Sequence, residues 1–312
     1  MSHMSKHIQV CCRIRQCDDP DVFTAGEGVE VRSKGVFEMD RAFGVESQEQ
    51  IYEAVVRPMV RDAFTGFNCS LFSYGQTGSG KTHTLIGGTG DNRGIIPRAA
   101  EQIFAQVQAL EGNLGTGTQK TGNLGTSCHV KLSVLEVYQE QLKDLLSMQT
   151  GANYTQNMGL GSMGMGLGSM SIGGVMGGGV QLRIREQVDG TVWVEGLIEE
   201  AVQDEEGFKN LLGAALRRRV VGAHGMNDVS SRSHLCCIVT LHQSQPSTGV
   251  KISSKVHLVD LAGSEMVVKT GAKGVRFSEA RHINKSLSAL GNVISALSGR
   301  GKEDEGGVGA GA

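Results

Sequence analysis

The sequence predicts an α/β domain in which a doubly wound, mostly parallel sheet carries helices on both of its faces. Short runs of β-branched and apolar residues alternate along the chain with segments whose apolar residues recur every three or four positions. Such alternation favours parallel strands. A helix between two strands carries the chain back to the end of the sheet where the first strand began, so the second strand runs in the same direction. With 312 residues and 39% hydrophobic content, the chain can bury a sizeable core.

The expected strands and helices follow from these two periodicities. Runs of β-branched and apolar side chains predict strands at 7–15, 69–74, 128–138, 235–243 and 254–262. Apolar spacing of three and four predicts helices at 48–64, 95–110, 204–221 and 279–297. The first helix should be kinked at Pro58, because proline has no N–H for the helical hydrogen bond.

Two glycine-rich segments, 111–127 and 151–180, interrupt this alternation. The second has eleven glycines, five methionines and no charged residue in thirty positions, a composition that cannot specify a packed element. We expect both to be flexible surface insertions in one domain that covers 7–298. The tail at 299–312 should be disordered, and the segment 1–6 is either disordered or left from an expression tag. A methionine-rich surface that binds a partner helix is the alternative for the second insertion.

Charge and cysteine content exclude several classes of protein. Thirty Lys and Arg residues against 32 Asp and Glu residues leave a net charge of −2, and no basic stripe with interleaved aromatic residues supports nucleic-acid binding. No apolar run reaches the eighteen residues of a membrane span, and the N-terminus has no signal-peptide core. The seven cysteines show no metal-binding spacing and include the pairs Cys11-Cys12 and Cys236-Cys237. We expect reduced thiols in the core of a cytosolic protein.

The segment GQTGSGKT, residues 75–82, fits the pattern of a phosphate-binding loop: Gly, four residues, Gly, Lys and then Ser or Thr. Glycines allow backbone N–H groups to wrap the phosphates, Lys81 can reach the β and γ oxygens, and the Thr82 hydroxyl can ligate magnesium. The apolar run 69–74 leads directly into the loop, as a phosphate loop between a strand and a helix requires. An ordinary glycine turn is the alternative.

Two further motifs narrow the chemistry. DLAGSE, residues 260–265, ends a strand with Asp260, where a magnesium-linked aspartate belongs, and places Gly263 where a backbone N–H could sense a γ-phosphate. NDVSSRSH, residues 227–234, surrounds Arg232 with hydroxyl groups. Taken singly, the first motif could be a strand-end turn and the second a polar turn before the next strand.

In this order and spacing, the three motifs resemble the kinesin motor domain. The resemblance extends through FEMDRAFG at 37–44, SVLEVYQEQLKDLL at 133–146 and EARHINKSLSALGNVISAL at 279–297, and the last is closest in style to conventional transport-type kinesins. It implies the fold of a P-loop NTPase. It also implies a microtubule-binding motor that binds ATP or ADP with Mg²⁺ and couples ATP hydrolysis to filament affinity and movement.

Two other functions are weighed against this one. A non-motile, structural microtubule-associated protein could keep the nucleotide fold. A GTP-binding switch is disfavoured, because NKSL at 284–287 lacks the aspartate of a guanine-reading NKxD loop.

The resemblance assigns roles by position within the two later motifs. Ser231 matches the magnesium ligand of the first switch, and Ser230 matches the hydroxyl that orients the attacking water. Arg232 and Glu265 would form an ion pair that closes the two switches when γ-phosphate is present, with the water relayed towards Glu265. The implied magnesium ligands are Thr82, Ser231 and Asp260, and the implied catalytic residues are Ser230, Ser231, Arg232, Gly263 and Glu265.

The base side of the nucleotide departs from the family pattern. Kinesins carry an Arg-x-Arg-Pro run that helps to hold adenine, whereas this chain has Arg13 and Arg15 but Gln16 in place of the proline. His83 could stack on the base or be merely packed. A second departure is Met266, where these motors often carry a basic residue. The implied nucleotide-binding residues are Arg13, Arg15, Gly75, Gln76, Thr77, Gly78, Ser79, Gly80, Lys81, Thr82 and His83.

The microtubule contact is implied to follow DLAGSE. Basic residues there could attract the carboxylate-rich filament in a salt-dependent way, or could form a merely solvated basic loop. The expected contacts are Lys269, Lys273, Arg276, Arg281 and Lys285. The implied location is the cytoplasmic microtubule cytoskeleton, with a ciliary or axonemal place left open.

The family continues beyond the helix at 279–297 with a strand, further helices and a neck. This chain is therefore expected to be either an excerpt of a longer protein or an incomplete motor. In the first case, dimer or cargo partners would bind through segments absent here.

Overall fold

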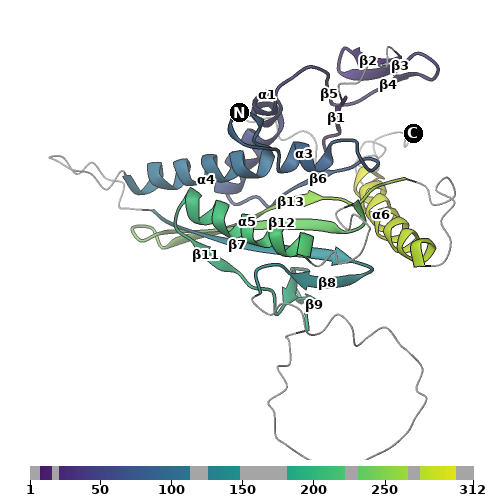
Figure 1. Ribbon diagram of the computed structural model, residues 1–312. Helices are drawn as coiled ribbons and strands as arrows, with labels where there is room; N and C mark the ends of the chain where they lie inside the picture. Colours follow the sequence, from purple (N-terminus) through teal and green to yellow (C-terminus); the bar gives the residue numbers. More distant parts are fainter. Residues whose placement is uncertain are drawn as a thin grey trace, which may run out of the picture.

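A computed structural model describes residues 8–15, 21–112, 126–147, 181–221, 231–265 and 275–299 (Figure 1). The insertion expected at 151–180 and most of that at 111–127 lie outside the described residues. So do the N-terminal segment 1–6 and all but the first residue of the 299–312 tail.

A six-stranded sheet forms the centre of the molecule (Figure 1). Its strands are β6 (Cys69–Ser73), β7 (Ser127–Tyr138), β8 (Gln141–Asp144), β11 (Glu200–Val202), β12 (His234–Gln245) and β13 (Val250–Asp260). They lie in the spatial order β11-β7-β12-β13-β6, with β8 also paired to β7. The four expected strands from 69–74 onward are all present.

The central sheet is mixed rather than mostly parallel, which corrects the expected strand direction. β6 and β13 run parallel, whereas the other four pairings described in this sheet are antiparallel. The reason is the length of the connections: residues 246–249 join β12 to β13, and Gln139 and Glu140 join β7 to β8, so neither connection can hold a crossover helix. Gln139 and Glu140 have φ of 50° and 63°, as the turn of a two-residue hairpin requires.

Helices form a layer on one face of the central sheet, and α6 (Val275–Gly299) contacts the other face at one end. The layer contains α2 (Arg57–Phe64), α4 (Ile95–Gly112) and α5 (Glu205–Val221). Alternate side chains of β12, among them Leu235, Cys237 and Val239, point into this layer and are buried in its core. The preceding His234 therefore points to the other face, where it contacts α6, drawn in yellow in Figure 1.

The helix expected at 48–64 is divided just before Pro58. α1 (Gln48–Ile51) leads into a π-helical turn, η1 (Tyr52–Val56), and α2 then begins with Pro58 in its first turn. Pro58 cannot donate a helical hydrogen bond. The expected kink therefore takes the form of the wider, π-helical turn that precedes Pro58.

Three smaller sheets contain the remaining strands. β1 (Cys11–Arg13) pairs in parallel with β5 (Arg41–Phe43); β2 (Val22–Ala25), β3 (Gly28–Val31) and β4 (Gly35–Phe37) form an antiparallel meander; β9 (Arg183–Glu186) and β10 (Val192–Glu195) form a hairpin. The strand expected at 7–15 is thus only three residues long. In the part of the chain that the structure describes, no helix is long and apolar enough to cross a membrane.

The cysteines are not all core residues, contrary to expectation. Cys128 and Cys237 are buried, but Cys11 is exposed and the other three described cysteines are half-buried; all six are free. Burial raises the pKa of Cys237 to about 12 and that of Cys128 to about 11. These two side chains therefore stay protonated and unreactive near neutral pH.

A buried ion network joins α5 to the central sheet. Arg219, near the end of α5, has its Nε 3.5 Å from the Glu136 carboxylate and its Nη1 3.8 Å from the Asp260 carboxylate. Arg219 Nη2 also donates to the backbone oxygen of Ser233 (3.0 Å), and the Ser233 hydroxyl donates to Glu136 (2.7 Å). One buried cation thus lies between two buried carboxylates, and the more exposed Lys143 lies 3.8 Å from Glu136. The network fixes α5, β7 and the end of β13 relative to one another.

Removal of the cation from this network should destabilise the fold. Arg219→Ala leaves the carboxylates of Glu136 and Asp260 buried without their main counter-charge, which typically costs about 3 to 5 kcal/mol. Arg217→Ala is the matched control, since Arg217 lies on the same helix but is exposed, and it should change stability by less than about 0.5 kcal/mol. Urea unfolding measures both, and equal midpoints for the two variants would contradict the role of the network.

Candidate nucleotide site

The phosphate loop, residues 74–80, connects β6 to the short helix α3 (Lys81–Leu85). Gly78 and Gly80 have φ of +78° and +101°, in the left-handed region that residues with a side chain rarely adopt. The loop conformation therefore requires glycine at position 80, which the sequence pattern fixes, and also at position 78, one of the four positions that the pattern leaves open.

Lys81 is directed back into the loop. Its Nζ donates hydrogen bonds to the backbone oxygens of Gly75 (2.8 Å) and Gln76 (3.0 Å). The Ser79 N–H donates to the same Gln76 oxygen at 3.2 Å. Burial lowers the pKa of Lys81, although nearby carboxylates oppose this effect. The ammonium group is thus held by neutral acceptors at the place where the pattern expects phosphate.

Asp260, at the end of β13, is joined to the loop through hydroxyl groups. Its carboxylate accepts hydrogen bonds from Thr82 Oγ1 (2.6 Å) and Ser73 Oγ (3.0 Å), and the residue is only 2% exposed. The contact follows from the sheet, because β6 and β13 are parallel neighbours in which Ser73 pairs with Asp260. Carboxylate and hydroxyl oxygens are the donors that Mg²⁺ prefers, so Thr82 and Asp260 fit a magnesium ion.

The segment after β13 is hydrogen-bonded to the other two motifs. The Gly263 N–H donates to the backbone oxygen of Ser231 (2.8 Å), and the Ser264 N–H donates to that of Gly75 (3.1 Å). The three motifs that the sequence singles out therefore meet around the adjacent ends of β6 and β13.

Glu265 binds the phosphate loop directly. Its carboxylate accepts hydrogen bonds from the Thr77 N–H (2.8 Å) and the Thr77 hydroxyl (2.5 Å). Burial opposes ionisation of Glu265, but these hydrogen bonds keep its pKa below the ordinary value. A Cβ at Gly263 would lie within 2.3 Å of oxygens of both side chains, so any larger residue there would displace this contact. Thr77 is thus the described partner of Glu265, and the Arg232–Glu265 ion pair stays a prediction for the γ-phosphate-bound state.

The residues expected near the base connect the first strand to α3 and the loop. Arg13 Nη1 donates to Gln48 Oε1 (2.7 Å) and to Thr84 Oγ1 (2.8 Å), and Gln48 Nε2 donates to the backbone oxygen of His83 (2.6 Å). Arg15 Nη1 donates to a backbone oxygen of the phosphate loop (2.5 Å). The His83 side chain is exposed beside them, and base stacking on it stays a prediction.

Several residues of the site were missed from the sequence. Glu136 carried a signal, because an acid within the apolar run SVLEVY needs a buried partner. Arg219 carried none, since it follows two other arginines and nothing local separates it from them. Gln48 and Ser73, which position Arg13 and Asp260, look like ordinary polar residues.

Part of the expected site lies outside the described residues. These positions are Gln16, Ser230, Met266, Lys269 and Lys273, together with the side chains of Arg276 and Arg281. Lys285 is described, and its Nζ lies 2.6 Å from a carboxylate oxygen of Glu140 while its side chain stays 69% exposed.

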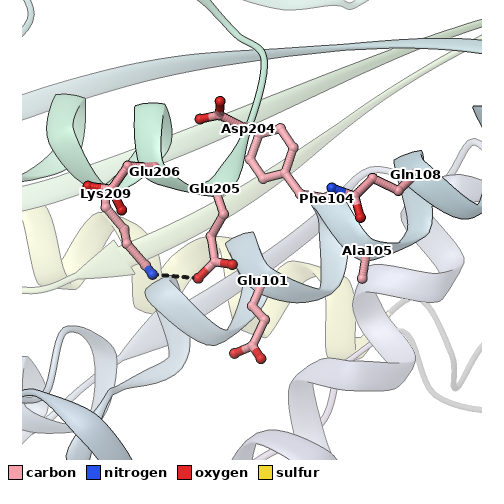
Figure 2. A pocket seen from close by; sticks show the side chains of 8 residues that line it. All are labelled: Glu101, Phe104, Ala105, Gln108, Asp204, Glu205, Glu206 and Lys209. Atoms are coloured by element: carbon pink, nitrogen blue, oxygen red, sulfur yellow. Dashed lines mark ion pairs between the residues drawn. The ribbon is translucent and has the colours of Figure 1, made fainter.

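A hollow of about 430 Å³ between α4 and the start of α5 is separate from this site (Figure 2). Three of the four acidic side chains that line it have partners. Glu205 pairs with Lys209 (2.6 Å), the pair drawn in Figure 2, and Glu101 pairs with Arg93 (3.1 Å). Asp204 accepts a backbone N–H at the start of α5 (2.7 Å). None of the three motifs lines this hollow.

Comparison with known proteins agrees with the motifs. The kinesin motor domain family model matches residues 2–305. Kinesin heavy chain isoform 5C of Homo sapiens is 34% identical over 302 residues, which cover 93% of this chain and 27% of that protein. The kinesin heavy chain of Botryotinia fuckeliana is 36% identical over 310 residues, which cover 94% of this chain and 31% of that protein.

A solved structure shows the same similarity in three dimensions. It is that of a fast kinesin, described for its ATPase mechanism and its interactions with microtubules, and it matches with a TM-score of 0.73 and 34% identity over 95% of this chain and 76% of that chain. The P-loop NTPase fold expected from the motifs is thereby confirmed. The chain spans less than a third of the length of the curated relatives above. It belongs to the kinesin motor domain family.

Proposed function

We propose that this chain hydrolyses ATP and uses the hydrolysis cycle to change its affinity for microtubules, as a motor of the kinesin type. The observation that carries the proposal is the 2.6 Å contact between Thr82 and Asp260 beside Lys81. A lysine, a hydroxyl and a carboxylate at adjacent strand ends are the groups that a magnesium-nucleotide site needs. Membership of the kinesin family supports the same function.

Lys81 would bind the β- and γ-phosphates. At present its Nζ donates to two neutral backbone oxygens, and an anionic phosphate oxygen is a stronger acceptor for an ammonium group. The nucleotide would therefore displace weaker hydrogen bonds within the loop. The residues proposed to surround it are Arg13, Arg15, His83 and the loop from Gly75 to Thr82.

Thr82 and Asp260 would hold Mg²⁺, and Ser231 is the third proposed ligand. The ion, when bound, would supply charge neutralisation to the phosphates. Arg219 Nη1 lies 3.8 Å from the Asp260 oxygen that accepts from Thr82, so α5 as well as the loop holds this acid in place.

Hydrolysis would be coupled to a change of partner at Glu265. In the described arrangement Glu265 is bound to Thr77, and we propose that γ-phosphate attracts the Gly263 N–H and allows Glu265 to pair with Arg232 instead. Ser230 would orient a water molecule that attacks the γ-phosphorus as the bond to the ADP oxygen breaks. The proton of that water would pass towards Glu265. Loss of phosphate would then release both switches.

Microtubules are the proposed partner, and the microtubule cytoskeleton is the proposed location. The basic side chains Lys269, Lys273, Arg276, Arg281 and Lys285 would face the acidic filament. Lys285 already pairs with an exposed carboxylate of this chain, Glu140, which indicates how such contacts would form. Exposed ion pairs are weak and screened by salt, so several are needed for useful affinity.

Nucleotide affinity should depend on Lys81. Lys81→Ala removes a charge-assisted hydrogen bond to phosphate, so ATP affinity should fall about tenfold to hundredfold. The fold should persist, because the described hydrogen bonds of Lys81 go to oxygens of the loop itself. Titration with ATP in the presence of magnesium measures the effect, with Lys251→Ala on the exposed end of β13 as control. Unchanged affinity in Lys81→Ala would exclude the phosphate-loop assignment.

The rate of ATP hydrolysis should depend on Glu265 more strongly than the affinity for ATP does. Glu265→Ala removes the proposed partner of Arg232 from the closed state, which typically costs about 3 to 5 kcal/mol, and single-turnover hydrolysis should slow about hundredfold or more. ATP should still bind. Glu27→Ala, at an exposed turn, is the control. A normal single-turnover rate in Glu265→Ala would rule out the switch pair.

Microtubule binding should weaken when basic charge is removed after DLAGSE. The double variant Lys269→Ala/Lys273→Ala should cosediment with microtubules less and show a shallower dependence on salt, because two attractive charges are lost. Lys34→Ala/Lys251→Ala removes the same charge from exposed positions on other elements and should leave cosedimentation unchanged. If both double variants behave like the unchanged chain, the proposed contact is elsewhere.

A further inference from the structure

A continuous chain of hydrogen bonds runs from the end of β13 to α6, and the proposed chemistry does not use it. The Ala262 N–H donates to His234 Nδ1 (3.0 Å), and His234 Nε2 lies 2.7 Å from Ser286 Oγ. The Ser286 hydroxyl donates to the backbone oxygen of Ile283 (2.8 Å). His234 is 8% exposed, whereas Ser286 is half-buried, so the hydrogen bonds lead from the interior to α6.

The donors fix the position of each hydrogen in this series of hydrogen bonds. The single hydroxyl hydrogen of Ser286 goes to Ile283, so Ser286 must accept from His234 Nε2–H. Nδ1 receives the Ala262 N–H and must carry a lone pair. The ring is therefore the neutral tautomer with its hydrogen on Nε2. Burial and, secondarily, the charge of Arg219 lower the pKa of His234, although Asp260 opposes them, and this favours the same neutral form.

The two ends of the chain lie in the parts that the proposed cycle must connect. Ala262 directly precedes Gly263, whose N–H is bound to Ser231. Ser286 lies on α6 beside Lys285. α6 has a second contact, in which Lys285 (2.6 Å) and His282 (3.7 Å) lie near Glu140. That contact is exposed to water, whereas the ring of His234 is enclosed.

We propose that His234 and Ser286 are positioning residues that transmit the position of the 261–265 loop to α6. The imidazole is a rigid spacer with a hydrogen bond at each end. A shift of Ala262 must therefore break one of these bonds or move α6 with it. The inference rests on the proposed function, because it names the residues through which nucleotide state would change microtubule affinity.

The test compares microtubule affinity in two nucleotide states. The dissociation constant of the 312-residue chain for microtubules is measured with ADP and with a non-hydrolysable ATP analogue, and the ratio of the two constants is the readout. Ser286→Ala keeps a good helix former but removes the acceptor of His234, so the ratio should shrink about twofold to tenfold, the value of one hydrogen bond. Ser286→Thr keeps the hydroxyl and should restore the ratio.

Histidine variants separate the two bonds. His234→Asn places an acceptor near the position of Nδ1 but does not reach Ser286, so it should match Ser286→Ala. In the double variant His234→Asn/Ser286→Ala, the ratio of the two dissociation constants should shrink no more than in either single variant, because both changes remove the same hydrogen bond. Ser298→Ala is the matched control, since the Ser298 hydroxyl also lies on α6 and donates to a helix oxygen (2.8 Å to Ile294), and its ratio should not change.

The outcomes distinguish this inference from the function on which it rests. If the unchanged chain binds microtubules equally in both nucleotide states, the proposed function fails and the inference fails with it. If the unchanged chain shows the difference and Ser286→Ala retains it in full, the proposed function stands and the inference is overturned. Equal loss in Ser286→Ala and Ser298→Ala would also overturn it, because the effect would then belong to α6 as a whole.

Discussion

The buried carboxylate of Asp260 is the constraint on which the rest of the structure depends. A carboxylate with 2% exposure must be paired and hydrogen-bonded, because an isolated charge in the interior is very costly. Arg219 supplies the counter-charge from α5, and the hydroxyls of Ser73 and Thr82 supply hydrogen bonds from β6 and α3. Three separate elements are therefore held at fixed positions around the end of β13, where the three sequence motifs meet.

The polar groups around this carboxylate have partners that a nucleotide could replace. Lys81 is bound to neutral backbone oxygens, and Glu265 is bound to the N–H and hydroxyl of Thr77. When Lys81 leaves them, the Gly75 and Gln76 oxygens still accept from the N–H groups of Ser264 and Ser79, so the free-energy cost of this exchange is small compared with that of breaking a buried ion pair. A rigid centre at Asp260 and exchangeable contacts in the loops suit a site whose conformation must follow its ligand.

Two contacts of α6 with the rest of the chain differ in their exposure and in the part of the chain that they reach. The contact of Lys285 with Glu140 is exposed, so water and salt weaken it. The contact of Ser286 with His234 is less exposed, because the His234 side is buried, and its geometry is set by a rigid ring. A ligand can shift an equilibrium only through contacts that differ between two states. The contact with His234 is the one that a movement of Ala262 would change directly, whereas the contact with Glu140 is available to an external acidic surface.

The sequence by itself determined the features that depend on local pattern. The phosphate loop needs glycine at Gly78 and Gly80 because of their own backbone angles, and strands and helices follow from periodicities within short windows. For the same reason the family could be recognised from three short motifs. The helix break before Pro58 was also local, since it follows from one missing N–H.

Only the tertiary structure decided which distant residues share a partner. Glu265 and Thr77 are 188 positions apart, and Arg219 looks the same in sequence as the two arginines that precede it. The direction of the strands was also wrong from sequence, because the overall alternation of strands and helices was given more weight than the short connections 246–249 and 139–140, which cannot hold a crossover helix. The distant pairs, by contrast, depend on how buried charges and polar groups meet after the chain has packed, and no local window of sequence contains both members of such a pair.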